Sequence, residues 1–246
     1  MPYRLPMRWS DLDQLNHVNN VVYLSYAAEA RAALVEDGVL DGDLEPVSIS
    51  IDFARPMLLS SRTVVVEQEL DGDVLTQLIT QESDPSAGPG PRGERVVYAS
   101  IATRLGARSD LGAPQVDGSM APFRGRRGDV GPSGRVDPVR VFEYFQESRI
   151  IWMSQGGRTR QLGHVVVANL EVEYGLPVPW RREPWEMVVA VAKFGTKSVT
   201  LACEWRDGPT VLARNSAVLV AFDIETQKAR SLTDAERIYL EGLGPA

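Results

Sequence analysis

A repeated segment constrains the fold of this chain more than any other feature of its sequence. The run YAAEAR at 26–31 recurs 118 positions later as YFQESR at 144–149, with tyrosine, glutamate and arginine at the same helical spacing. Further along, IDFARP at 51–56 matches VEYGLP at 172–177 at an offset of 121. Matches at two nearly equal offsets predict that one unit was duplicated and that its loops then changed in length.

Both halves have the same order of predicted elements. In the first half we expect a strand at 3–9, a helix at 20–37, and strands at 47–53, 63–70, 74–82 and 95–105. In the second half we expect a helix at 139–153, strands at 164–174, 185–194, 198–206 and 211–222, and a last helix at 233–243. Apolar alternation indicates the strands, Gly38 indicates the end of the first helix, and Thr233 with Glu236 forms a predicted capping box. One long helix followed by antiparallel strands predicts an α+β fold in each half.

The expected boundaries divide the chain into three parts. Residues 1–106 form the N-terminal unit, and residues 136–246 form the C-terminal unit. Between them, residues 107–135 are rich in glycine, proline and arginine, which predicts a linker with a partial strand near Phe123. The Pro/Gly-rich run at 83–94 predicts a long loop between two strands of the first unit.

The composition excludes several classes of function. A net charge of -7 argues against nucleic acid as a partner, because phosphate binding needs a basic surface. One cysteine, Cys203, excludes an internal disulfide, and with two histidines it cannot build a common zinc site. The N-terminal residues lack the apolar core of a signal peptide, and no run reaches membrane-spanning length. We therefore expect a cytoplasmic protein with no metal, no cofactor and no membrane insertion.

The residues best suited to chemistry lie at 8–31. Two carboxylates, Asp11 and Asp13, precede His17, and asparagines able to cap a helix follow before its first turn. A carboxylate and an imidazole at the start of a buried helix can transfer protons beside a pocket. Main-chain N–H groups at 18–21, free at a helix start, can stabilise an oxyanion with help from the helix dipole. Asp11 is expected to hold the loop rather than to react.

The segment SDLDQLNHVNNVVYLSY at 10–26 resembles the signature of hotdog-fold acyl thioesterases. It is similar to thioesterases of the 4-hydroxybenzoyl-CoA type, and to the pattern DLD-x-N-x-HVNN-x-x-Y of plant acyl-carrier-protein (ACP) thioesterases. The resemblance implies a long central helix wrapped by a curved antiparallel sheet. Two such units in one chain imply a tandem, or double, hotdog that forms a pseudo-dimer.

The resemblance also implies roles for individual residues. Asp13 matches the acid that acts as general base or nucleophile, and His17 matches the histidine of the plant-type site. Asn20 falls where a main-chain N–H polarises the thioester carbonyl. We group its neighbours Asn19 and Val21 with it as candidate oxyanion donors at the start of the helix.

This chain departs from the plant pattern in two places. The plant-type asparagine lies two residues after the acid, where this chain has Leu15, so Asn16, one place later, is the candidate. Pro56 and Met57 stand where the plant pattern has glutamate and cysteine, which excludes a cysteine nucleophile. The catalytic mechanism of either family therefore cannot be transferred unchanged to this chain.

The second copy lacks the reactive residues. The offset of 118 sets Asp13 against Gly131 and His17 against Arg135, so we expect one working site per chain. Further candidates for substrate contact are Tyr23, Arg124, Arg126 and Arg127, the arginines through the phosphates of coenzyme A.

Together these features predict a thioester hydrolase that cleaves acyl-CoA or acyl-ACP to a free acid and a thiol. Coenzyme A enters only as part of the substrate, and the pseudo-dimers could pair further into a homo-oligomer. Two alternatives remain open. A hotdog enoyl-CoA hydratase would have the pattern D-x-N-P-x-H, whose proline is missing from DQLNH at 13–17. A non-catalytic acyl-CoA-binding module would account for the degenerate second copy.

Overall fold

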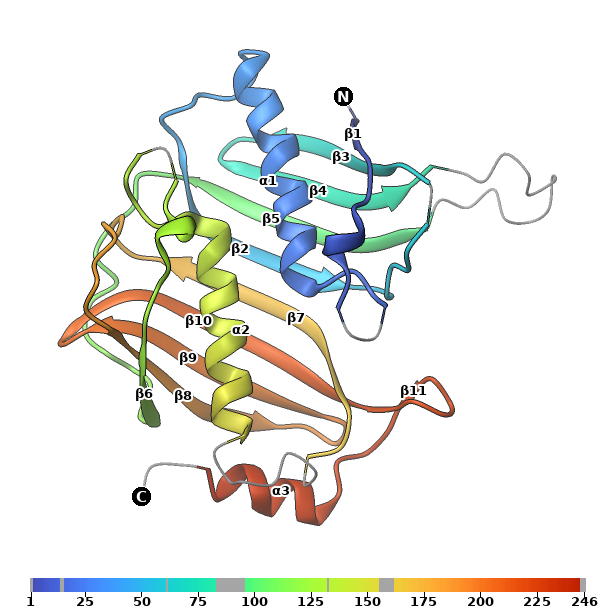
Figure 1. Ribbon diagram of the computed structural model, residues 1–246, viewed down its shortest axis with the longest axis vertical. Helices are drawn as coiled ribbons and strands as arrows, with labels where there is room; N and C mark the ends of the chain where they lie inside the picture. The colour runs from blue at the N-terminus through green and yellow to red at the C-terminus, as the bar shows by residue number, and fades with distance from the viewer. Residues whose placement is uncertain are drawn as a thin grey trace. The chain divides into compact units, whose positions relative to one another are not determined.

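A computed structural model describes residues 2–13, 16–60, 62–82, 96–131, 133–154 and 162–243. The chain divides into two compact units, Met1–Ala107 (unit 1) and Arg108–Ala246 (unit 2), each with a long helix against an antiparallel sheet (Figure 1). The loop predicted at 83–94 lies outside the described residues.

Unit 1 is built from a short strand, a helix and four further strands. Its elements are β1 (Tyr3–Leu5), the 3-10 turn η1 (Trp9–Asp11), α1 (Asn20–Glu36), β2 (Glu45–Phe53), β3 (Val64–Asp71), β4 (Val74–Gln81) and β5 (Val97–Gly106). The strands pair antiparallel in the order β1-β3-β4-β5-β2, and α1 packs against one face of this sheet. Burial of one sheet face by one long helix is the arrangement that the sequence predicts for this half.

Unit 2 has the same arrangement with additions at its end. Its elements are β6 (Ser119–Phe123), the 3-10 turn η2 (Arg127–Asp129), α2 (Pro138–Ser154), β7 (Val165–Tyr174), β8 (Trp185–Phe194), β9 (Ser198–Asp207), β10 (Thr210–Asp223), β11 (Lys228–Ala229) and α3 (Asp234–Glu241). The strands pair antiparallel in the order β6-β8-β9-β10-β7, with β11 on β10. This order equals that of unit 1 when each strand is matched to its repeat.

The predicted helices and strands are confirmed to within three residues at their ends, with one exception. The first strand ends at Leu5 rather than Trp9, because Pro6 has no N–H for a sheet hydrogen bond and a 3-10 turn follows at Trp9–Asp11. Strand β11 and the two 3-10 turns were not predicted from the sequence. Residues 107–135, expected to form a linker with a partial strand, contribute β6 and η2 to unit 2.

The start and end of α1 follow from its flanking residues. Asn19 caps the helix, since its side-chain oxygen accepts a hydrogen bond from the main-chain N–H of Val21 at 3.0 Å. Gly38 follows the last turn with φ of +68°, a conformation that favours glycine. The small side chains of Ala27 and Ala30 are almost completely buried, so the sheet can approach the helix closely here.

Two glutamines of the sheet use that close approach. Gln77 on β4 donates to the carbonyl of Ala27 at 2.8 Å, and Gln68 on β3 donates to the carbonyl of Ala30 at 2.9 Å. Gln77 also donates to the side-chain oxygen of Gln68 at 2.8 Å. These polar contacts in an otherwise apolar layer fix α1 along the sheet.

The core of unit 2 is larger and aromatic. The rings of Tyr144, Trp205 and Trp185 meet edge to face, with centroids 5.5 and 5.1 Å apart. Cys203 is buried beside them on the inner face of β9, which confirms its predicted place in the core. Arg149 of α2 is also buried and donates to the side-chain oxygen of Asn215 at 2.8 Å.

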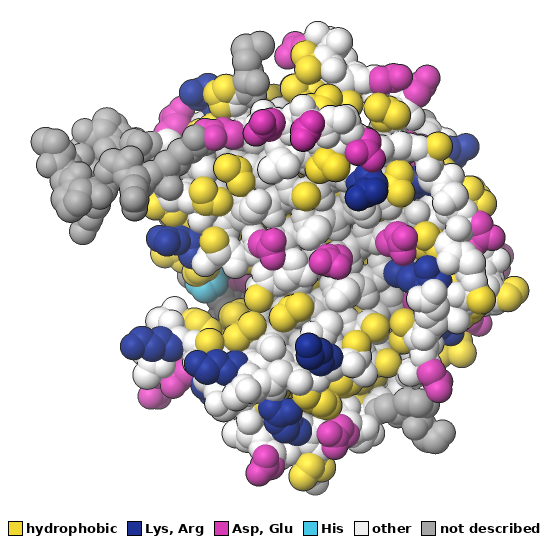
Figure 2. All heavy atoms as spheres, turned by 180° about the vertical axis from the view of Figure 1, so that it is seen from behind, with side chains coloured by type: hydrophobic (Ala, Val, Ile, Leu, Met, Phe, Trp, Pro, Cys, Tyr) yellow, Lys and Arg dark blue, Asp and Glu magenta, His cyan; other side chains and the backbone are white. Residues whose placement is uncertain are grey.

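The sheet face of unit 1 that points away from α1 is polar. Asp52, Glu67, Glu69 and Thr76 alternate along their strands with buried residues of the inner face. Figure 2, which views the molecule from behind, shows acidic and other polar side chains there, with hydrophobic groups dispersed among them. Within the part of the chain that the structure describes, no helix is long and apolar enough to cross a membrane.

The last helix, α3, is fixed by the capping box that the sequence predicts. Thr233 accepts from the main-chain N–H of Glu236 at 3.2 Å, and Glu236 accepts from the N–H of Thr233 at 2.9 Å. Arg230 and the N–H of Gly163 also donate to the Glu236 carboxylate, at 2.6 and 2.9 Å. The Arg230 guanidinium, assisted by Thr233 and Gly163 against the effect of burial, lowers the pKa of Glu236 to about 2.

We expect Glu236→Gln to lower the free energy of unfolding at neutral pH by about 1–3 kcal/mol. Because the carboxyl pKa is about 4.3 when unfolded, this contribution is complete above that value. It is lost as the pH falls toward the folded pKa of about 2. Urea denaturation should therefore show a difference between wild type and variant at pH 7 that shrinks at pH 3. The exposed Glu241→Gln on the same helix serves as control, and a Glu236→Gln difference independent of pH would contradict the assignment.

Candidate active site

The predicted reactive residues lie on a short closed loop directly before α1. A β-bridge between Leu12 and Val18 closes the loop. Inside it, the N–H of Asp13 donates to the carbonyl of His17 at 2.7 Å, and the N–H of Asn16 donates to the carbonyl of Asp13 at 3.1 Å. Asn16 has φ of +57°, a left-handed conformation that asparagine tolerates better than most residues. Asn16 is exposed, and its role as a catalytic candidate stays a prediction.

Asp13 and His17 are brought together by this loop. The Asp13 carboxylate oxygen Oδ1 accepts a hydrogen bond from the main-chain N–H of His17 at 3.1 Å. Both residues are half-buried, and the start of α1 follows within three residues of His17. A carboxylate in this position is oriented by the main chain and lies close in sequence to the positive end of a helix dipole.

The loop between β2 and β3 supports the reactive loop from one side. The N–H of Val18 donates to the carbonyl of Met57 at 2.9 Å, and a β-bridge joins His17 to Leu58. Tyr23 of α1 reaches the same segment, since its hydroxyl accepts from the N–H of Met57 at 3.0 Å. The reactive loop is therefore supported by the backbone of the β2–β3 loop.

Tyr23 is a core residue, and its predicted contact with substrate stays a prediction. Its side chain is 2% exposed, and its ring packs edge-on against Phe53 with centroids 5.5 Å apart. Burial, with smaller effects of Tyr98 and Asp13 and against the Met57 hydrogen bond, raises the pKa of Tyr23 to about 12. The hydroxyl therefore stays protonated and uncharged at neutral pH.

The amides at the start of α1 are less free than expected. The N–H groups of Val18 and Asn19 are bonded to the carbonyls of Met57 and Asp11, and that of Val21 is bonded to the Asn19 side chain. Val21 and Asn19 are therefore not available as oxyanion donors, because the chain itself uses their amides to close the loop and cap the helix. Of the four amides from Val18 to Val21, only that of Asn20 has no acceptor among the described residues.

The same loop geometry recurs in unit 2 without the reactive side chains. A bridge between Val130 and Val136 closes the loop, and the N–H of Gly131 donates to the carbonyl of Arg135 at 2.9 Å. Gly134 has φ of +75° where Asn16 has +57°. These contacts join the residues that correspond to those of unit 1 at the offset of 118. Gly131 and Arg135, however, occupy the positions of Asp13 and His17.

The three arginines proposed for phosphate contact belong to unit 2. The guanidinium of Arg127 stacks over the ring of Trp180 at 4.2 Å, and the main-chain N–H of Arg126 donates to Asp129 at 2.6 Å. The side chains of Arg124 and Arg126 are exposed. Contact of these residues with substrate stays a prediction. Within the described ranges, no group of three histidine, cysteine or acidic side chains is arranged to hold a metal ion.

Comparison with known proteins agrees with the resemblance predicted from 10–26. The family model described as the acyl-ACP thioesterase C-terminal domain matches residues 2–84, a range that includes the whole reactive loop. No curated protein matches the chain. The family match covers unit 1 only, so it places the thioesterase signature in the first copy of the repeat.

Three solved structures of similar fold cover nearly the whole chain. A putative oleoyl thioesterase from Lactobacillus plantarum has a TM-score of 0.64 at 8% identity, covering 90% of this chain and 96% of its own. The 12:0-ACP thioesterase from Umbellularia californica has a TM-score of 0.60 at 10% identity, covering 94% and 97%. An acyl-ACP thioesterase from Bacteroides thetaiotaomicron has a TM-score of 0.58 at 10% identity, covering 89% and 97%.

These findings confirm the predicted resemblance to hotdog-fold acyl thioesterases and the predicted enzyme class, a thioester hydrolase. Because the three structures are at most 10% identical to this chain, their similarity shows a shared hotdog fold and no more. The family match adds a similarity in sequence to thioesterases over the range that contains the reactive loop. The substrate, the carrier and the roles of single residues are separate questions.

Proposed function

We propose that this chain is a tandem double hotdog that hydrolyses an acyl thioester of coenzyme A or ACP to a free acid and a thiol. One observation carries the proposal. The Asp13 carboxylate is held by the N–H of His17 on a closed loop that leads into α1, where the Asn20 amide has no acceptor among the described residues.

In the proposed reaction, the N–H of Asn20 and the dipole of α1 stabilise the oxyanion that forms when the thioester carbonyl is attacked. Asp13 either takes the proton from the attacking water or attacks the carbonyl itself to form an anhydride that water then cleaves. The carbon–sulfur bond breaks and the electron pair leaves with the thiolate, which needs little acid assistance. His17 is proposed to orient the water, the Asp13 carboxylate or the leaving group.

The tandem arrangement rests on the repeat. Helices α1 and α2 begin and end 118 residues apart, and the strand order of the two units is equivalent. Gly131 and Arg135 cannot replace a carboxylate base and an imidazole, so we propose that unit 1 holds the one working site of the chain.

The charge distribution of unit 1 favours an anionic carrier. Arg8 precedes the reactive loop, and Arg55 and Arg62 flank the segment that contacts it. The opposite end of α1 and its following loop are acidic, with Glu36, Asp37, Asp41 and Asp43. Both coenzyme A and ACP are anionic, so these arginines support either carrier.

The test is a thiol-release assay of the purified chain. The panel contains acyl-CoA esters of increasing length, an aromatic acyl-CoA, and the corresponding acyl-ACPs. We expect stoichiometric release of thiol and free acid, with a preference for one carrier. A change in enoyl absorbance without thiol release would instead identify a hydratase. Tight binding of acyl-CoA without turnover would identify a non-catalytic module, and inactivity toward all substrates would reject the proposal.

A further inference from the structure

The proposed reaction leaves two polar groups in unit 1 without a role, the buried hydroxyl of Tyr26 and the half-buried carboxylate of Asp11. The hydroxyl of Tyr26, on α1, donates to the Asp11 carboxylate oxygen Oδ2 at 2.6 Å. The same oxygen accepts from the main-chain N–H of Arg8 at 2.7 Å. The carbonyl of Asp11 accepts from the N–H of Asn19 at 2.9 Å. Asp11 therefore joins the 3-10 turn, the capping residue of α1 and the second turn of α1.

We propose that Tyr26, acting through Asp11, is a positioning residue that sets the place of the Asp13 carboxylate at the start of α1. This inference rests on the proposed thioesterase function. It goes beyond that function because neither Tyr26 nor Asp11 is asked to touch the substrate or the reacting atoms.

The connectivity of the loop supports this role. Asp13 lies two residues after Asp11, and the hydrogen bonds of its own main chain stay inside the loop, to His17 and Asn16. Among the described residues, the loop contacts the rest of the unit through the hydrogen bonds of Asp11, which we call the Asp11 anchor, and through the Met57 segment that binds Val18. Without the Tyr26 hydroxyl, the Asp11 carboxylate would keep its bond from the N–H of Arg8, but it would lose its bond to α1. A reacting group displaced by about 1 Å can lose roughly 100-fold in rate, so a loose anchor is expected to act on turnover.

The Tyr26 hydroxyl stays a hydrogen-bond donor to Asp11 over the pH range in which the enzyme works. Tyr26 is 4% exposed, and burial together with the hydrogen bond to Asp11 raises the pKa of its hydroxyl well above the usual range. The hydroxyl therefore remains a donor, and it donates to a carboxylate, which makes the bond stronger than one between neutral groups. Its effect on rate should be the same at every pH where the enzyme works.

Unit 2 supplies a matched control inside the same chain. Tyr144 donates to the Oδ2 oxygen of Asp129 at 2.9 Å, Asp129 accepts from the N–H of Arg126 at 2.6 Å, and its carbonyl accepts from the N–H of Asp137 at 2.9 Å. This is the anchor of unit 1 moved by 118 positions. The loop that it holds has Gly131 in place of Asp13, so it positions no carboxylate.

The experiment compares Tyr26→Phe with Tyr144→Phe for thiol release and thermal unfolding. We expect both variants to lower Tm by a similar amount, since each removes one buried hydroxyl from the same kind of contact. Only Tyr26→Phe should lower kcat, by about 10- to 100-fold, with KM changed less than about twofold. The Asp13→Asn, Tyr26→Phe double variant should be no slower than Asp13→Asn alone, because both changes act on the same carboxylate.

A second pair of variants keeps the proposal testable if Tyr26→Phe folds poorly. Asp11→Asn retains an oxygen that can accept from Tyr26 and Arg8, so it should keep most of the activity, whereas Asp11→Ala should lose as much as Tyr26→Phe. Equal kcat values in wild type, Tyr26→Phe and Tyr144→Phe would overturn the positioning role while leaving the thioesterase intact. A wild-type chain without thiol release would overturn both.

Discussion

Replacement of Asp13 by asparagine is expected to lower kcat for thioester hydrolysis by about 100- to 10 000-fold, the range lost when a general base is removed. Asparagine keeps the side-chain oxygen that accepts from the N–H of His17, so the loop should stay in place while the proton acceptor disappears. The fold should be unaffected, because the carboxylate is half-buried on a loop and contributes little to the core. Steady-state thiol release, with far-UV circular dichroism and Tm for the same samples, measures both expectations.

The control for Asp13→Asn is the same loss of charge elsewhere on unit 1. Glu36 ends α1 at the opposite end of the helix and is exposed, so Glu36→Gln should keep wild-type kcat and KM. If Asp13→Asn also turned over at the wild-type rate, Asp13 would have no part in the chemistry. If it were inactive but unfolded, Asp13→Ser, which also lacks the carboxylate in a smaller side chain, would separate loss of fold from loss of the base.

The helices could be predicted from the sequence because the residues at their ends and the internal repeat indicate the same boundaries. Gly38 and the Thr233–Glu236 capping box each specify a local backbone geometry that needs no tertiary partner. The match of 26–31 to 144–149 then places the second helix from the first. Such local signals do not depend on which residues lie nearby in space.

The site could be located from the sequence, but its internal contacts could not be assigned. Tyr23 and Tyr26 lie on a helix whose residues are apolar or small on most sides, so periodicity does not say which tyrosine faces the sheet and which faces Asp11. The main-chain N–H of Val21 is bonded to the side chain of Asn19. An asparagine before a helix can cap it through more than one N–H group, so the sequence does not predict this particular contact. The sequence signal for the contact between Tyr26 and Asp11 is the recurrence of this pair as Tyr144 and Asp129 at the offset of 118.

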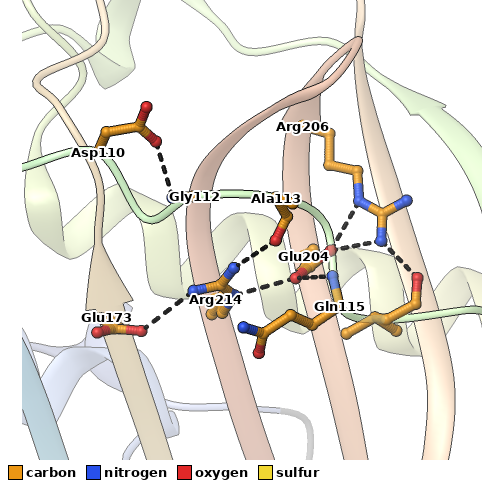
Figure 3. Close-up of polar contacts among 9 residues, drawn as sticks. Asp110, Gly112, Ala113, Gln115, Glu173, Glu204, Arg206 and Arg214 are labelled. Atoms are coloured by element: carbon orange, nitrogen blue, oxygen red, sulfur yellow. Dashed lines mark hydrogen bonds and ion pairs between the residues drawn. The ribbon is translucent and has the colours of Figure 1, made fainter.

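Residues 107–135 were expected to be a linker because they contain few apolar residues. Their contacts with distant parts of the chain cannot be predicted from composition. Residues 110–117, which we call the strap, run over the outer face of the unit 2 sheet (Figure 3). They are held by Glu204 and Arg214, which follow the strap by about ninety to a hundred residues in the sequence. Contacts at such separations leave no trace in local pattern or propensity.

Glu204 is the centre of this attachment. Its carboxylate is 0% exposed and accepts from the main-chain N–H of Gln115 and from Arg214, both at 3.0 Å, and from Arg206 at 2.8 Å (Figure 3). Arg214 also donates to the carbonyl of Ala113 at 2.9 Å. Burial alone would raise the pKa of Glu204, but the hydrogen bonds from Gln115, Arg206 and Arg214 outweigh it and lower the pKa.

Replacement of Glu204 by glutamine should lower the free energy of unfolding at neutral pH by about 3–5 kcal/mol, the usual cost of removing one partner from a buried ion pair. The variant leaves Arg206 and Arg214 without a carboxylate beneath the strap. Because the folded pKa of Glu204 lies below its unfolded value of about 4.3, its contribution is complete above that pH and is lost as the pH falls through the folded pKa. Urea denaturation at neutral and acid pH measures the difference, and hydrogen exchange should show faster exchange at the Gln115 amide.

Two further variants decide whether the charge or the shape of Glu204 matters. Glu171 is exposed on β7 of the same sheet, so Glu171→Gln should change stability by less than about 0.5 kcal/mol. The triple variant Glu204→Leu, Arg206→Met, Arg214→Leu removes the whole ionic cluster, and it should recover much of the stability lost in Glu204→Gln because no buried charge is left unpaired. Two results would contradict this role of the buried carboxylate: a Glu204→Gln variant as stable as wild type, or a triple variant less stable than Glu204→Gln. Either result would mean that the strap is held by its main-chain contacts.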